Sequence, residues 1–163
     1  MQPLVEETMK KAAIAWLSTP AGTPCPVWCL WLDGCLYVVS GPGEQPAPGL
    51  VGAAEVGVTA RGDHGGRVVT WPARVSPVEP GGEEWERVVP QLAGKRLNAP
   101  GSATGTAARW AAECVVSRLE PAGDPTEAGP DLPDASGAAP PVPTPANRRT
   151  AKPFRLHRVR GVE

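Results

Sequence analysis

Apolar residues fall in short runs and alternations through most of the first 120 residues, which is the spacing typical of β-strands. The stretch Val27–Leu32 has no polar face, so we expect a strand that is covered on both sides. Asp33-Gly34 follows it, and a second apolar stretch, Leu36–Ser40, comes directly after. This order is the strongest short-range signal for a β-hairpin. Four further strands are predicted over residues 14–18, 56–60, 67–78 and 114–119.

Beyond residue 82 the apolar positions change from a strand period to a helical one. Four apolar side chains recur at helical spacing and predict the buried face of an amphipathic helix: Trp85, Val88, Val89 and Leu92. We expect this helix over Glu83–Leu97, with a kink at Pro90. Further helices are predicted over Leu4–Ala13 and Thr104–Glu113, and a short one over 50–54. Pro72 lies within the strand predicted over 67–78 and indicates a sheet edge or a bulge there.

The order of these elements predicts an α+β fold that is mainly β, a small six-stranded antiparallel barrel with flanking helices. Proline and glycine number 21 and 19 among 163 residues, and nine of the prolines lie within residues 121–163. A segment of that composition cannot bury enough apolar surface to fold alone. We therefore expect one domain over residues 1–120 and a proline-rich, disordered tail over 121–163, with a basic end at Arg148–Arg160.

The charge is nearly balanced, with 16 Lys and Arg against 17 Asp and Glu and a net charge of −1. Domains held to nucleic acids or to anionic membranes usually carry a clear basic excess. No stretch approaches the roughly 20 apolar residues of a membrane span, and residues 1–11 lack the apolar centre of a signal peptide. We therefore expect a cytoplasmic protein that binds neither nucleic acid nor membrane.

Four cysteines are expected as free thiols in that reducing compartment: Cys25, Cys29, Cys35 and Cys114. Structural zinc usually needs two closely spaced pairs of ligands. Cys29 lies inside a predicted strand and Cys114 is far along the chain, so we expect no metal site. His64 is one of two histidines, and its place among glycines favours the tip of a hairpin over a catalytic base.

One succession of motifs is similar to that of a known family. The residues that carry the likeness are Ala13–Thr19, Gly22, Pro24, Pro26–Trp31, Asp33-Gly34, Leu36–Ser40, Glu84-Trp85 and Lys95–Asn98. Over roughly residues 5–119 the chain resembles the pyridoxamine 5'-phosphate oxidase-like split-barrel family, which includes flavin- and deazaflavin-dependent reductases. The resemblance implies a split barrel and a homodimer with two cofactor sites at the subunit interface. The implied ligands are FMN or a deazaflavin and a small planar substrate.

In that family the flavin ring lies against the backbone of the second and third strands. Hydroxyls at the end of the third strand hold the phosphate, together with a Lys or Arg that opens the next short helix. Ser40 keeps the hydroxyl position, but the basic position falls near Gln45-Pro46. No Lys or Arg occurs between Lys11 and Arg61, and Glu44 carries the opposite charge. Charge-assisted donors are the strong ones for a phosphate, so this departure bears on whether FMN binds.

Trp28 and Trp31 point to opposite sides of one predicted strand. We expect one to fill the barrel and the other to meet a partner subunit or a planar ligand. Around this wall the resemblance implies donors to the phosphate or ribityl chain at Ser40, Gly41 and Arg61. Peripheral donors are expected at Lys95 and Arg96, whose position at a helix C-terminus is explained equally well by the helix dipole.

Three functions are consistent with these residues. The first is an oxidoreductase in which the bound flavin or deazaflavin supplies the chemistry. The second is a non-catalytic dimeric split-barrel protein that has lost flavin-phosphate binding, and the missing basic residues favour it. The third is a haem-handling relative, which needs a histidine at the ring face. In the tail, Arg155-Leu156-His157 matches a substrate-contacting stretch of the oxidases that name the family, although a basic docking peptide explains it as well.

Overall fold

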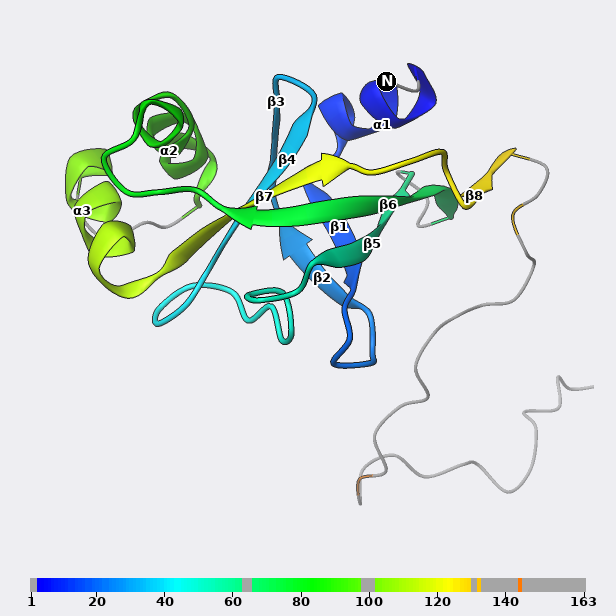
Figure 1. Ribbon diagram of the computed structural model, residues 1–163, viewed down its shortest axis with the longest axis horizontal. Helices are drawn as coiled ribbons and strands as arrows, with labels where there is room; N and C mark the ends of the chain where they lie inside the picture. Colours follow the sequence, from blue (N-terminus) through cyan, green and yellow to red (C-terminus); the bar gives the residue numbers. More distant parts are fainter. Residues whose placement is uncertain (1–2, 63–65, 98–101, 130–131, 133–143, 145–163) are drawn as a thin grey trace, which may run out of the picture. The chain divides into compact units, whose positions relative to one another are not determined.

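The computed structural model describes residues 3–62, 66–97, 102–129, 132 and 144. Over these residues it contains three helices and eight strands (Figure 1). The helices are α1 (Pro3–Lys11), α2 (Glu83–Lys95) and α3 (Ala103–Glu113). The strands are β1 (Ile14–Ser18), β2 (Cys25–Trp28), β3 (Leu30–Leu32), β4 (Cys35–Ser40), β5 (Glu55–Arg61), β6 (Arg67–Pro77), β7 (Val115–Pro121) and β8 (Glu127–Ala128). None of the helices in this part of the chain combines the length and apolar character that a membrane crossing requires.

The strands form one antiparallel sheet in the order β2-β1-β5-β6-β7-β4-β3, with β8 added beside β6. The two end strands of this path, β2 and β3, belong to one extended segment and are separated only by Cys29. Because a single residue joins both ends of the path, the sheet curls into a nearly closed barrel. The mainly β, antiparallel barrel with flanking helices that the sequence predicts is thereby confirmed.

Two local features raise the number of strands above the predicted six. The segment predicted as one strand, Val27–Leu32, breaks at Cys29, whose backbone N–H donates to the carbonyl of Ala13 at 3.2 Å. The residues on either side of the break therefore pair with different neighbours, β1 and β4. The second feature is β8, which lies beyond the predicted end of the domain and pairs with Val69 and Thr70.

The hairpin predicted at Asp33-Gly34 is confirmed. It joins β3 to β4 with Leu32 opposite Cys35. Asp33 has a φ of 49° and Gly34 a φ of 78°. Positive φ at both central residues is what a two-residue type I′ turn requires, and its twist matches that of the flanking strands. The local chemistry of two residues thus fixes the register of this part of the barrel.

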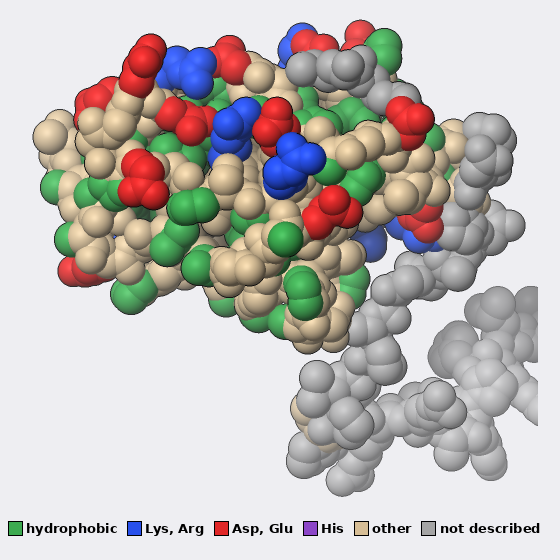
Figure 2. Space-filling model, viewed as in Figure 1, with side chains coloured by type: hydrophobic (Ala, Val, Ile, Leu, Met, Phe, Trp, Pro, Cys, Tyr) green, Lys and Arg blue, Asp and Glu red, His purple; other side chains and the backbone are tan. Residues whose placement is uncertain are grey.

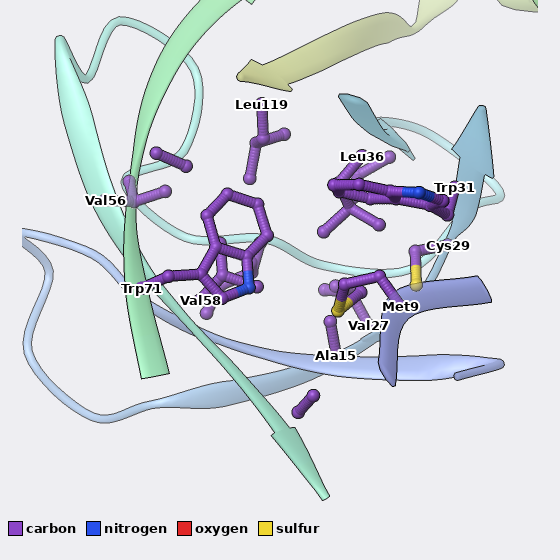
Figure 3. Close-up of a cluster of buried hydrophobic side chains, with 14 of the residues drawn as sticks. Met9, Ala15, Val27, Cys29, Trp31, Leu36, Val56, Val58, Trp71 and Leu119 are labelled. Atoms are coloured by element: carbon purple, nitrogen blue, oxygen red, sulfur yellow. The ribbon is translucent and has the colours of Figure 1, made fainter. Parts of the chain in front are cut away.

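The barrel interior is filled by aromatic and aliphatic side chains from the strands and from α1 (Figure 3). Trp71 is fully buried, and the ring of Trp31 meets it edge-on with the centroids 6.0 Å apart and the planes at 81°. Met9 and Val5 of α1 cover the barrel beside them. The prediction that one tryptophan of the Trp28–Trp31 pair fills the barrel is confirmed, and that residue is Trp31.

A second core lies between the outside of the barrel and the helices α2 and α3, which pack together (Figure 1). The helical face predicted from spacing is buried as expected, with Trp85, Val88, Val89 and Leu92 each at most 5% exposed. Trp110 of α3 is fully buried in the same core. The end of α2 contributes Lys95 to the lining of the pocket described below, and Arg96 follows directly after the helix.

The helix predicted over 50–54 is absent, and the edge predicted at Pro72 is confined to one side of its strand. Residues 50–54 form turns, with Gly49 and Gly52 at positive φ, because a left-handed backbone interrupts a helix. Pro72 lies in β6 opposite Gly57 of β5, and on its other side it falls between the β7 ladder, which ends at Ala73, and the β8 ladder, which begins at Thr70. Its carbonyl accepts from the N–H of Ala122, in the connection where β7 gives way to β8. The missing N–H of the proline faces this gap and interrupts no ladder.

The first compact unit of the chain runs to Leu132, past the boundary predicted at residue 120. Glu127 of β8 accepts a hydrogen bond from the Thr70 hydroxyl at 2.9 Å and pairs with Arg67 at 3.3 Å. Glu127 and Ala128 therefore belong to the sheet. The predicted disordered tail, its basic end and Arg155-Leu156-His157 lie outside the described residues, as does His64. Figure 2 shows Lys and Arg interspersed with Asp and Glu over one face of the molecule.

Candidate ligand-binding pocket

A pocket of about 510 Å³ lies where four segments meet: the junction of α1 and β1, the break between β2 and β3, the loop after β4, and the end of α2. Its lining is largely apolar and is made by Ala13, Ile14, Trp28, Cys29, Gly43, Glu44, Gln45, Lys95, Arg96 and Leu97. Ile14 and Leu97 are 48% and 86% exposed, so the pocket reaches the surface beside them. A concave apolar site with a few convergent polar groups is the usual form of a small-molecule site.

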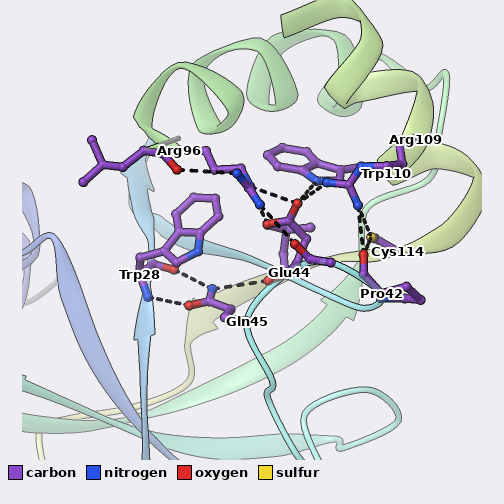
Figure 4. A network of polar contacts seen from close by, with 11 residues as sticks. Trp28, Pro42, Glu44, Gln45, Arg96, Arg109, Trp110 and Cys114 are labelled. Atoms are coloured by element: carbon purple, nitrogen blue, oxygen red, sulfur yellow. Dashed lines mark hydrogen bonds and ion pairs between the residues drawn. The ribbon is translucent and has the colours of Figure 1, made fainter. Parts of the chain in front are cut away.

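Trp28 forms the aromatic wall of this pocket. Its ring lies 6.3 Å from that of Trp110, with the planes tilted by 38°. The side-chain amide of Gln45 holds the backbone of Trp28 on both sides, accepting from its N–H at 2.7 Å and donating to its carbonyl at 2.8 Å (Figure 4). The same amide donates to the carbonyl of Val39 at 3.2 Å. Gln45 therefore takes the place of a neighbouring strand at the break in the barrel and orients the tryptophan.

Glu44, next to Gln45, is the centre of a buried ionic network (Figure 4). Its side chain is 1% exposed, and the side chains of Arg96 and Arg109 are 16% and 27% exposed. Nε of Arg96 donates to both carboxylate oxygens, at 2.9 and 2.7 Å. Nη2 of Arg109 and the indole N–H of Trp110 donate to Oε1, the latter at 2.8 Å. Three residues from two helices thus converge on one carboxylate.

The two arginines also bind the backbone of the loop after β4. Arg96 donates to the carbonyl of Gly43 at 3.0 Å, and Arg109 donates to that of Pro42 at 2.8 Å. Burial alone would raise the pKa of Glu44, but the hydrogen bonds from Arg96, Trp110 and Arg109 outweigh it and hold the pKa below its usual value. Glu44 is therefore ionised at neutral pH and fastens this loop to α2 and α3.

Lys95 is the remaining cation at the pocket. Among the described residues, no hydrogen bond or ion pair to its ammonium group is found, in contrast to Arg96 beside it. Cys29 lies on the opposite wall and is 2% exposed. Burial raises the pKa of the Cys29 thiol to about 12, although the positive charge of Lys95 lowers it in part. The thiol is un-ionised at neutral pH, so it contributes to packing and not to nucleophilic chemistry.

The structure brings together only some of the residues predicted for a cofactor site. Trp28, Lys95 and Arg96 line the pocket. Trp31 does not, because the break at Cys29 leaves it inside the barrel against Trp71. Arg96 is occupied by Glu44 and is no peripheral donor.

Ser40 and Gly41 lie at the end of β4, away from the pocket lining. Ser40 is 7% exposed. Gly41 has a φ of 142°, and a Cβ built on it would lie 2.9 Å from Cα of Cys114 and 3.1 Å from the carbonyl of Glu113. This close approach of two backbones explains why the position holds glycine. The amides of Gly41 and Gly43 therefore belong to a packed turn, in which the N–H of Glu44 donates to the carbonyl of Gly41 at 3.0 Å.

Arg61 belongs to a second pocket, also of about 510 Å³, which shares Ala13 and Ile14 with the first. Its guanidinium carbon lies 4.3 Å from the centre of the Trp16 ring, in a cation–π arrangement. Lys11 and Glu7 of α1 line the same pocket. Arg61 is thus separated from the Trp28 pocket by the junction of α1 and β1.

Sequence reasoning missed the partners of Glu44 and the role of Gln45. The absence of Lys and Arg between Lys11 and Arg61 is real, but Arg96 and Arg109 reach the loop from helices 52 and 65 residues away. One signal was present: an acidic residue, Glu44, stands beside the position near Gln45-Pro46 where the resemblance implies a basic one. The acidic residue indicated that the phosphate site had changed, but it did not indicate which residues pair with its negative charge.

Comparison with solved structures identifies the fold. HutZ, the haem storage protein of Vibrio cholerae, superposes with a TM-score of 0.55 and 17% identity, over 76% of this chain and 91% of that chain. A protein of Listeria innocua assigned as a pyridoxamine 5'-phosphate oxidase gives 0.53 and 15%, over 75% and 94%. A protein of Bacteroides thetaiotaomicron assigned to 5-nitroimidazole antibiotic resistance gives 0.50 and 16%, over 73% and 78%.

These likenesses show the fold alone: the chain shares the barrel fold of these solved structures, which is the fold that the sequence resemblance implied. No protein-family model matches the sequence, and the comparison with curated proteins found no match. At identities of 15–17% the shared fold does not carry over a ligand or a reaction. The function therefore has to be argued from the pocket itself.

Proposed function

We propose that this chain is a dimeric split-barrel oxidoreductase that binds a flavin- or deazaflavin-type ring beside Trp28. The observation that carries the proposal is the largely apolar pocket of about 510 Å³ walled by an indole that Gln45 holds in place. A planar ring gains dispersion and aromatic contact on such a wall. When bound, the ring supplies hydride transfer with a small planar substrate. The chain binds and orients the ring and keeps water from its face.

The residues present fit a ring but not a phosphate at the position that the resemblance implies. At the ring end, the ammonium group of Lys95 is an available polar group. At the phosphate end, Ser40 is buried, and Arg96 is already paired with the carboxylate of Glu44. We therefore assign no step to a phosphate-bearing cofactor at that end.

A specific observation favours the second candidate, a dimeric split-barrel binding protein without catalysis. Glu44 neutralises Arg96 and Arg109, the arginines nearest the loop after β4. A chain that has given up the phosphate can retain the apolar pocket for another planar ligand. The two candidates differ in whether the purified protein takes up a redox-active ring.

Absorption spectroscopy tests the proposal directly. We expect the purified protein, or the protein titrated with FMN, riboflavin and reduced deazaflavin, to bind one of these rings saturably and to quench tryptophan fluorescence. Trp28→Ala should weaken binding about five- to 150-fold, because stacking on an indole contributes on the order of 1–3 kcal/mol. Trp28→Phe should retain part of it. Trp16→Ala is the matched control, since it removes an indole from the other pocket.

Binding of none of these rings rejects the first candidate and leaves the second. An absorption spectrum of the haem type would instead favour the haem-handling alternative, for which the two histidines lie outside the described residues. A loss of ring affinity in Trp16→Ala equal to that in Trp28→Ala would show that the ring does not bind in the proposed pocket.

The dimer is part of the proposal. Ile14 and Leu97 expose apolar side chains at the edge of the pocket, and a second subunit would bury them. Size-exclusion chromatography with light scattering should give twice the mass of one chain. Leu97→Glu should shift the population to monomer, whereas Val51→Glu, at an exposed apolar residue away from the pocket, should not. A wild-type monomer at micromolar concentration would refute this part.

A further inference from the structure

We propose that Arg96, Arg109 and Trp110 form an oxyanion site that the chain fills with its own carboxylate, Glu44, and that this residue selects against ligands with a phosphate at that end. Selection against phosphate-bearing ligands rests on the proposed function. The existence of an oxyanion site filled by Glu44 is independent of it. With Glu44 in place, we expect the pocket to admit a planar ring that carries no phosphate at the end facing the loop after β4. With Glu44 removed, we expect the site to bind inorganic phosphate or a phosphate monoester.

The donors that meet at Glu44 are of the kind that bind phosphate. Nε of Arg96 donates to both oxygens at 2.9 and 2.7 Å, and Arg109 and the Trp110 indole donate to Oε1. Guanidinium groups match the geometry of carboxylate and phosphate oxygens alike. Two positive charges face one negative charge, so a doubly charged phosphate in place of the carboxylate would balance both arginines.

The position of the network connects it to the ligand pocket. Glu44 lies between Gly43 and Gln45, and all three residues line the pocket beside Trp28. Arg96 lines the pocket as well, and its remaining contacts hold the loop by Gly43. A ligand whose ring lies on Trp28 therefore has one end near an ionised, 1% exposed carboxylate. A phosphate at that end would meet a like charge and two arginines that are already paired.

The network at Glu44 differs from other ion pairs of the chain in its burial and in the number of donors. Glu127 is bound by one arginine, Arg67, and by the Thr70 hydroxyl, and Asp33 pairs with Arg87 while both side chains are about half exposed. Only at Glu44, among the described residues, do two arginines and an indole N–H converge on one buried carboxylate. The donors around it would be left without an acceptor if the side chain were shortened.

The test uses the full chain with inorganic phosphate as the first probe. Glu44→Ala should be stabilised by millimolar phosphate, seen as a rising midpoint of thermal unfolding with phosphate at constant ionic strength, because a ligand that binds only the native state stabilises it. Wild type should not respond. Glu127→Ala, which also removes a carboxylate from an arginine, is the matched control and should not respond. Adding Arg109→Ala to Glu44→Ala should abolish the effect.

The second probe is a pair of rings that differ only by the phosphate, FMN and riboflavin. Wild type should bind riboflavin at least as tightly as FMN. In Glu44→Ala the ratio of the two affinities should shift toward FMN by at least about tenfold, the least expected of one charge-assisted hydrogen bond. Glu44→Gln, which fills the space without a charge, should shift the ratio by less.

The outcomes keep the two proposals apart. A phosphate response in Glu44→Ala without any ring binding leaves the oxyanion site standing and removes the proposed function. Ring binding with no phosphate response, or with an equal response in Glu127→Ala, overturns the oxyanion site. If Glu44→Ala is unfolded in anion-free buffer, refolding in phosphate or acetate becomes the measurement, and failure of both anions to restore the fold overturns it as well.

Discussion

Replacing Gly41 with alanine tests how the loop that carries Glu44 is held. A Cβ at this position would lie 2.9 Å from Cα and 3.0 Å from Sγ of Cys114, and 3.1 Å from the Glu113 carbonyl. Two of these three atoms are backbone, so the clash cannot be relieved by turning a side chain. Overpacking of this kind costs about 1–3 kcal/mol, and a positive φ in a residue with a Cβ costs about 1–3 kcal/mol more. We therefore expect Gly41→Ala to lose about 2–6 kcal/mol of unfolding free energy.

Gly22→Ala is the matched control because Gly22 has a φ of 110° with no atom within 4 Å of the added Cβ. It should lose only about 1–2 kcal/mol, the cost of the backbone conformation alone. Urea denaturation followed by tryptophan fluorescence measures both losses, with unchanged m-values as the check on two-state unfolding. Equal losses in the two variants would show that the contact between Gly41 and Cys114 does not contribute, and the reasoning would be wrong.

Three further predictions concern groups on either side of this loop. Because the pKa of Glu44 is lower in the folded chain, its charge stabilises the fold above the ordinary carboxyl pKa of 4.5, and this contribution is lost as the pH falls through the folded pKa. The difference in unfolding free energy between wild type and Glu44→Gln should therefore shrink in acid, and a constant difference would contradict this. Cys29, with a pKa of about 12, should resist alkylation at pH 8 until urea is added, as measured by peptide mass spectrometry; rapid native labelling would refute its burial. A chain ending at Leu132 should keep the melting temperature of the full chain, whereas one ending at Glu120 loses β8 and should melt several degrees lower. Identical melting of the two truncations would show that β8 adds nothing.

The parts of the fold that local chemistry determines could be predicted from the sequence. Asp33-Gly34 specifies its turn because both residues tolerate positive φ. The face of α2 follows from the spacing of Trp85 and Leu92 with the valines between them. The break at Cys29 could not be predicted, since it depends on the carbonyl of Ala13, which only the folded chain brings near.

The candidate site was predictable in outline and not in its charges. Alternation along one segment placed Trp28 and Trp31 on opposite sides, but only packing decides which one meets Trp71. Glu44 looked like an uncompensated acidic residue because its cations lie on helices that follow much later in the chain. A buried ionic network is a property of tertiary structure, and a single sequence carries no periodic signal for it.

A crystal structure of the protein with bound riboflavin tests the central claim most directly. The account predicts the isoalloxazine ring in the pocket beside Trp28, with the carboxylate of Glu44 still bound by Arg96 and Arg109. A ring bound elsewhere on the barrel, or a Glu44 side chain released to solvent with its arginines holding the ligand, would contradict it.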